Sequence, residues 1–134
     1  MTRLIEIEGI GPAHAARLEG VGVTSIESLL KTAGSAAGRK QLAAKADIDE
    51  SKLLEWVNHA DLMRIKGVGS EFSDLLEAAG VDSVPELANR NPDNLHAKML
   101  ETNEAKKLVR RVPTLEETRR WVTEAKTMDR AVTH

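Results

Sequence analysis

The sequence predicts an all-α protein built from two similar repeats that pack as one compact helical domain. Aromatic residues make up only 2% of the 134 residues, so the core must consist of aliphatic side chains, which favours packed helices. Residues that start and stop helices recur along the chain, whereas no long stretch alternates polar and apolar residues as a strand would. The pattern of residues 7–29 also recurs at 65–87.

Composition sets the broad class of protein. Hydrophobic residues make up 41% and charged residues 30%, which is typical of a soluble domain. The chain has no cysteine, no apolar run long enough to span a membrane and no apolar signal region, so we expect a cytoplasmic protein without a membrane partner. The four histidines lack metal-ligand spacing, so we expect neither a metal site nor a cofactor.

Charge is distributed unevenly along the chain. The net charge is −2, but residues 61–87 carry six acids against two bases, and residues 88–134 carry ten bases against seven acids. A nearly neutral total still permits a polyanion as partner, but it excludes the strongly basic character of a protein that coats DNA.

The internal repeat has a constant offset of 58 residues over its best-matched part. Both copies have an apolar residue, then a Gly–apolar–Gly turn, a short helix signal, Gly–Val and a serine; the coincident positions include Ile7/Ile65, Gly9/Gly67, Gly11/Gly69, Leu18/Leu76, Gly22/Gly80, Val23/Val81, Ser25/Ser83 and Leu29/Leu87. The repeat predicts two copies of one supersecondary unit.

Helix signals then give the elements in order. Pro12 suits a first helical turn, Asn91 before Pro92 reads as a cap, and Thr24/Glu27, Ser83/Glu86 and Thr114/Glu117 have capping-box spacing. Gly22 and Gly80 have the character of left-handed helix stops. The resulting helices are expected at 12–20, 25–33, 36–45, 50–64, 70–79, 84–89, 92–101, 103–111 and 114–128.

A second pair of similar segments has an offset of 65: WVNHADLM at 56–63 and WVTEAKTM at 121–128. The second repeat therefore carries about seven extra residues, which we expect near 88–113. The repeats are expected at 1–60 and 61–128, with 129–134 as a C-terminal tail. Because only Leu4 to Ile7 precedes the first turn, we expect helix 114–128 to pack beside that turn, with Trp56 and Trp121 in equivalent core positions. The same need could be met in a domain-swapped homodimer, so the chain is expected as a monomer or such a dimer.

The glycine turns suggest a role. A tight turn between helices requires positive φ, which favours glycine, while Ile10 and Val68 are expected to point inward. This pattern resembles the helix-hairpin-helix family, whose fold is SAM-like or similar to the polymerase-β N-terminal domain. The tandem arrangement is similar to a bacterial family known only as a domain of unknown function, a label that carries no activity.

The resemblance implies contact with a nucleic-acid backbone through main-chain amides at a helix start. In the first copy it implicates Gly9, Ile10, Gly11 and Ala13, with His14 and Arg17 able to face a phosphate. A weaker second site comprises Lys66, Gly67, Gly69 and Ser70, where Glu71 and Asp74 compete for the helix dipole. A separate basic patch is expected on helix 103–111, where Lys106/Arg110 and Lys107/Arg111 have i, i+4 spacing.

Two functions remain open at this point. The first is weak, non-enzymatic and sequence-independent binding of duplex DNA, because the larger domain and nucleophile of the glycosylase relatives are absent and few aromatics are available to stack single-stranded bases. The alternative is a protein-interaction or scaffold module that keeps the fold without binding nucleic acid. The acidic second hairpin favours that alternative.

Overall fold

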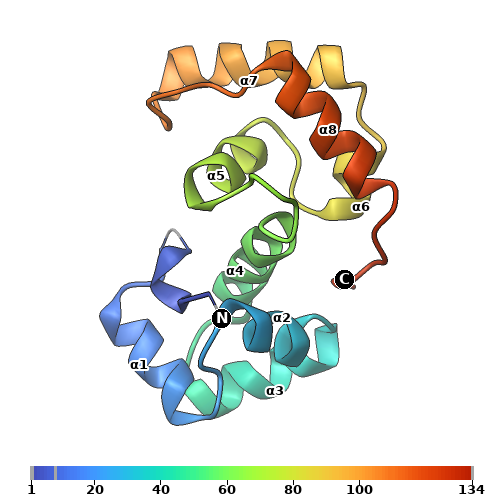
Figure 1. The fold of residues 1–134 in the computed structure, drawn as a ribbon. Helices are drawn as coiled ribbons and strands as arrows, with labels where there is room; N and C mark the ends of the chain where they lie inside the picture. The colour runs from blue at the N-terminus through green and yellow to red at the C-terminus, as the bar shows by residue number, and fades with distance from the viewer. Residues whose placement is uncertain (1, 8, 134) are drawn as a thin grey trace. The chain divides into compact units, whose positions relative to one another are not determined.

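The computed structural model describes residues 2–7 and 9–133, and these contain eight α-helices, a 3₁₀-helix at Leu4–Glu6 and no strand (Figure 1). The all-α class is therefore confirmed for the described residues. The chain divides into two compact units: unit 1 is Met1–Asp61 with Ala131–His134, and unit 2 is Leu62–Arg130. Unit 2 is thus inserted into the chain of unit 1.

Unit 1 contains four helices, joined by short connections. They are α1 (Pro12–Gly20), α2 (Ile26–Ala33), α3 (Ala36–Ala46) and α4 (Glu50–Leu62), the last of which ends at the unit boundary. Helix α3 packs against both α1 and α2. The core of unit 1 is aliphatic apart from Trp56 and includes the fully buried side chains of Leu4, Ile7, Leu18, Leu29 and Leu53.

Unit 2 repeats this order of helices. They are α5 (Ser70–Ala78), α6 (Val84–Ala88), α7 (Pro92–Lys106) and α8 (Leu115–Ala125). Helix α8 packs against α6 and α7, and α5 packs against α7. The core again consists of aliphatic side chains around one tryptophan and includes Ile65, Leu75, Leu76, Leu87, Leu95, Met99, Trp121 and Val122.

Most helix boundaries follow from the capping residues. The Asn91 side chain accepts from the Asn94 amide, and Thr114 with Glu117 forms a complete capping box. The expected Thr24/Glu27 box is wrong, because Ser25 caps α2 and pairs with Ser28. The Glu27 carboxylate instead accepts from the Thr2 amide at 2.8 Å. Thr24 and Ser25 are adjacent hydroxyl residues, so the sequence alone did not decide which of them caps the helix.

The expected pair of helices at 92–101 and 103–111 is wrong. One helix of 15 residues, α7, covers 92–106 and stops at Lys107, whose φ of 52° is left-handed. Arg110 and Arg111 therefore lie beyond the helix, and the predicted i, i+4 face of basic residues does not exist. Asn103 enforces the stop: its side chain accepts from the Val109 amide at 2.9 Å and donates to the Val109 carbonyl at 3.2 Å.

The two glycine turns have nearly the same backbone. Gly9 and Gly67 have φ of 93° and 91°, while Ile10 and Val68 are buried as expected. Gly11 is different: its φ of −85° is open to any residue, so only the first glycine of each pair is needed for its conformation. The helix stops at Gly22 and Gly80 are left-handed, as predicted, with φ of 91° and 99°.

The first turn takes its tryptophan from α4 and not, as expected, from the C-terminal helix. A β-carbon built on Gly9 would lie 3.3 Å from Nε1 of Trp56, and one built on Gly67 would lie 3.4 Å from Nε1 of Trp121. Each turn is therefore covered by the tryptophan that follows it within the same unit. Helix α4 carries the tryptophan of the first repeat, and α8 carries that of the second.

The second repeat is two residues shorter than the first before α7, and its extra residues lie at two places, within α7 and after it. The offset between copies is 58 at Ser25 and Ser83, 56 at the caps Ser35 and Asn91, 60 at the helix ends Asp47 and Lys107, and 65 at the two tryptophans. Helix α7 is thus longer than α3, and the largest insertion lies at 108–113, between α7 and α8. This insertion carries Arg110 and Arg111.

Replacing Gly9 by alanine should lower the free energy of unfolding by about 1–2 kcal/mol, because a left-handed φ disfavours a β-carbon. The matched change Gly20→Ala lies within α1, where a β-carbon meets nothing within 4 Å, and should raise stability by a few tenths to about 1 kcal/mol. Urea unfolding of both variants measures the difference. Equal effects of the two substitutions would contradict the role assigned to Gly9.

Candidate functional site

The first glycine turn presents the open start of a helix. The Ile10 amide donates to the Ile7 carbonyl, and the Ala15 amide donates to the Gly11 carbonyl, which is the first bond of α1. Pro12 has no amide hydrogen, so the orphan donors of the first turn are those of Ala13 and His14. Gly11 is the N-cap and has no side chain to accept from them. The turn therefore ends in uncapped main-chain donors at the positive end of a helix dipole.

Gly11 has no internal reason to be glycine. Its backbone is extended, and a β-carbon built there meets no atom within 4 Å. Gly69 has the same properties in the second turn. The absence of a side chain at both positions leaves the space outside each helix start open, so an external group can approach the backbone there.

His14 is half-buried and packs on a tryptophan. Its ring centroid lies 5.0 Å from that of Trp56, with the planes inclined at 59°. Phe72 occupies the equivalent place in unit 2, 5.3 Å from Trp121 and inclined at 51°. The offset of 58 pairs His14 with Phe72, so the alignment of the repeats could have predicted this packing role. The sequence analysis considered His14 only as a phosphate ligand.

Arg17 is exposed and is tied to the end of another helix. Its Nη1 donates to the Asp47 carbonyl at 3.0 Å, and Asp47 is the left-handed C-cap of α3. A cation at the negative end of a helix is stabilising. This bond uses one of the five N–H donors of the guanidinium.

The second turn differs in its electrostatics. The Lys66 amide donates to both carboxylate oxygens of Glu124, at 3.2 and 3.4 Å. Glu71 lies in the first turn of α5, which begins at Ser70, directly after Gly69. An acidic group thus occupies one donor of this turn, and another reduces the attraction of the helix start for an anion. Lys66 corresponds to Glu8 in the repeat, and Glu8 lies outside the described residues.

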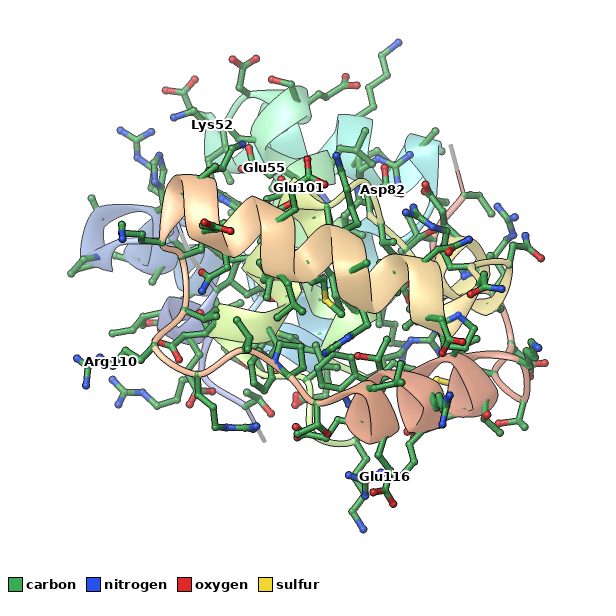
Figure 2. All side chains as sticks on the ribbon, turned by 90° about the horizontal axis from the view of Figure 1, so that it is seen from above. Lys52, Glu55, Asp82, Glu101, Arg110 and Glu116 are labelled. Atoms are coloured by element: carbon green, nitrogen blue, oxygen red, sulfur yellow. The ribbon has the colours of Figure 1, made fainter. Side chains whose placement is uncertain are left out.

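The four residues of the expected basic patch have different environments. Arg111 lies 5.3 Å from the centre of the Phe72 ring and forms an ion pair with Glu117 at 2.8 Å. Lys106, Lys107 and Arg110 are exposed, and the Arg110 side chain extends away from the ribbon (Figure 2). Arg111 is also exposed, but its contacts with Phe72 and Glu117 hold the inserted segment to the rest of unit 2.

The ion pair has a large electrostatic consequence. The Arg111 guanidinium, together with the Thr114 amide, lowers the pKa of Glu117 from 4.5 to about 2. Elsewhere, the Thr2 amide lowers the pKa of Glu27, and hydrogen bonding with Asp82 raises the pKa of Glu86. None of these three carboxylates belongs to the first glycine turn, so these shifts reflect local structure.

The described residues form a small all-α protein, and comparison with known families makes this more specific. Residues 8–128 match the family described as "Domain of unknown function (DUF4332)", and the chain belongs to this family. No solved structure matches the chain. Among the described residues, no helix is long and apolar enough to cross a membrane.

One curated relative resembles part of the chain. It is the poly(3-hydroxyalkanoate) polymerase subunit PhaC of Haloferax mediterranei, which is 41% identical over 54 residues. The aligned stretch makes up 40% of this chain but only 10% of that subunit. A segment similar to part of this chain therefore occurs within a much longer protein.

Replacing Arg111 by glutamine should raise the pKa of Glu117 from about 2 toward 4.5, leaving the smaller effect of the Thr114 amide. Because the folded-state pKa is depressed, the pair contributes stability above pH 4.5, and this contribution is lost as the pH falls from 4.5 toward 2. An NMR titration of the Glu117 carboxyl checks the shift. Arg119→Gln, which removes the exposed pair with Asp93, should leave that titration unchanged.

Proposed function

We propose that the two glycine turns are helix-hairpin-helix motifs and that the protein is a non-enzymatic module that binds the backbone of duplex DNA through the first turn. The observation that carries this proposal is the uncapped start of α1, where Gly11 leaves room for an external group. A phosphate oxygen is the ligand that suits two free amides at a helix N-terminus.

The chemistry of this turn favours sequence-independent contact. Main-chain donors reach phosphate oxygens but do not read base edges, so they position a protein on DNA without specifying a sequence. Arg17, one turn further along α1, adds an exposed cation whose remaining donors can reach a neighbouring phosphate. Lys106, Lys107 and Arg110 supply a second, separate source of positive charge.

The difference between the turns limits the affinity. Glu124 and Glu71 oppose an anion at the second turn, so one turn carries most of the contact. A few phosphate contacts give dissociation constants of about 10⁻⁴–10⁻⁶ M at physiological salt. We therefore expect weak binding that falls as salt rises, with a slope of about −0.9 in log K per phosphate contacted.

Replacing Gly11 by aspartate tests the first turn directly. The backbone at Gly11 accepts any residue, and an aspartate N-cap satisfies the first-turn amides while adding negative charge. Helix stability should therefore stay within roughly a few tenths of a kcal/mol of the parent or rise. Duplex-DNA affinity at low salt should fall roughly tenfold or more, about 1.4 kcal/mol. Fluorescence anisotropy with a labelled duplex at several salt concentrations measures both affinity and slope.

The matched control is Gly69→Asp, which introduces the same chemistry at the second turn. It should change DNA affinity little, because Glu124 and Glu71 already oppose an anion there. Equal losses from the two variants would show that the second turn also binds. No binding by the parent chain at low salt, or binding without a salt slope, would reject the proposal.

The second candidate function is a protein-interaction module that keeps this fold without nucleic-acid contact. The partial match within a polymerase subunit favours it, because a module carried in a longer protein can serve to join proteins. The net charge of −2 is also unfavourable for DNA. A stable complex or oligomer that forms without DNA and is unaffected by Gly11→Asp would support this function over the first.

A further inference from the structure

The segment following unit 2 returns to unit 1 and is held there without forming a helix or a strand. Ala131–His134 belongs to unit 1, and the Val132 side chain is 1% exposed. The Thr133 amide donates to the Gly34 carbonyl at 2.8 Å, and the Thr133 carbonyl accepts from Arg39 Nη2 at 2.6 Å. Both main-chain groups of one residue are therefore held, with a buried valine beside them.

Gly34 allows this backbone to approach closely. A β-carbon built on Gly34 would lie 2.5 Å from the Ala131 carbonyl oxygen and 2.6 Å from that of Leu30. Its φ of −64° is ordinary, so conformation does not require glycine here. The lack of space requires glycine, because a side chain at this position would clash with the carbonyl oxygens of Ala131 and Leu30.

Arg39 is the unusual residue at this connection. It is 5% exposed, and its Nη1 donates to the carbonyls of Ala33 at 3.1 Å and Gly34 at 2.9 Å, while Nη2 holds Thr133. A buried cation is costly unless its donors are satisfied. Three main-chain carbonyls meet that need, and one of them comes from the C-terminal segment.

The second repeat has a different type of residue at the position of Arg39. Arg39 is four residues after the cap Ser35, and the fourth residue after the matching cap Asn91 is Leu95, which is completely buried in the core of unit 2. The first repeat therefore carries a cation where the second carries a core aliphatic residue. This difference between the repeats lies at the residue that binds the Thr133 carbonyl.

We infer that the α2–α3 connection, Ala33–Arg39, is a binding site for a short extended peptide, and that its resident ligand is the chain's own segment 131–133. The site recognises main-chain N–H and C=O groups through Gly34 and Arg39, and it buries one valine-sized side chain. Recognition of this kind tolerates varied sequence apart from the buried residue. The bound segment acts as a clasp that fastens the chain after unit 2 back to unit 1.

The clasp is a non-covalent contact within one chain, so a free peptide can compete with the tethered segment for the same site. A tethered segment acts at an effective concentration on the order of millimolar, so a free copy of the same peptide competes poorly with it. Removing the buried valine from the tethered segment should open the site to a free peptide. This gives a direct test with the 134-residue chain.

The experiment uses the Val132→Asp variant of the 134-residue chain and a fluorescein-labelled peptide of residues 129–134, DRAVTH. The variant should bind the peptide saturably and roughly tenfold or more tightly than the parent chain, whose site is filled. The matched peptide with aspartate in place of valine should bind roughly tenfold or more weakly, because burying a charge in an apolar site is unfavourable. Equal binding of both peptides, or none, would overturn the inference.

A second measurement covers the case in which Val132→Asp does not fold. Amide hydrogen exchange in the parent chain should show protection of Thr133, whose N–H is bonded to Gly34. Arg39→Leu reproduces the residue of the second repeat and should retain helical circular dichroism while Thr133 loses protection. An unprotected Thr133 in the parent chain, or one unchanged by Arg39→Leu, would contradict the clasp.

Discussion

Each unit depends on the contact between a tryptophan and a glycine in the left-handed conformation. The positive φ of the turn glycine, Gly9 or Gly67, lets the backbone reverse before the next helix, and the indole of Trp56 or Trp121 lies beside that glycine. The buried residue that follows, Ile10 or Val68, fixes the turn to the same core. The first and last elements of each unit are thereby joined at one point, which defines where the next helix begins.

This shared framework explains why the two units diverge where they do. Turn, helix stop and closing tryptophan are retained because the core requires them, whereas residues outside that core are free to differ. The ring over the tryptophan is His14 in one unit and Phe72 in the other. The amide before the turn glycine is bonded to Glu124 in unit 2, and the segment between the last two helices is longer there. These differences therefore lie on a common fold.

Local patterns predicted most of the fold. Caps, prolines and left-handed glycines are decided by neighbouring residues, so the starts of α1 and α7 and the stops at Gly22 and Gly80 could be placed from sequence. The pairing of tryptophans with turns could not, because either tryptophan suits either turn by composition. The single helix α7 was also missed, since its stop depends on Asn103 bonding to Val109, a side-chain contact that no periodicity reveals.

The candidate site was predicted only in part, and one structural feature escaped prediction entirely. The open start of α1 followed from its glycines, but the bond from Arg17 to Asp47 depends on how α1 packs on α3. Residues 131–133 return to unit 1, and apart from one valine nothing in their sequence predicts this. This return means that unit 1 is interrupted by all of unit 2 during synthesis. A ribosome must complete residues 62–130 before the last part of unit 1 emerges, so the unit that begins first is the one that finishes last.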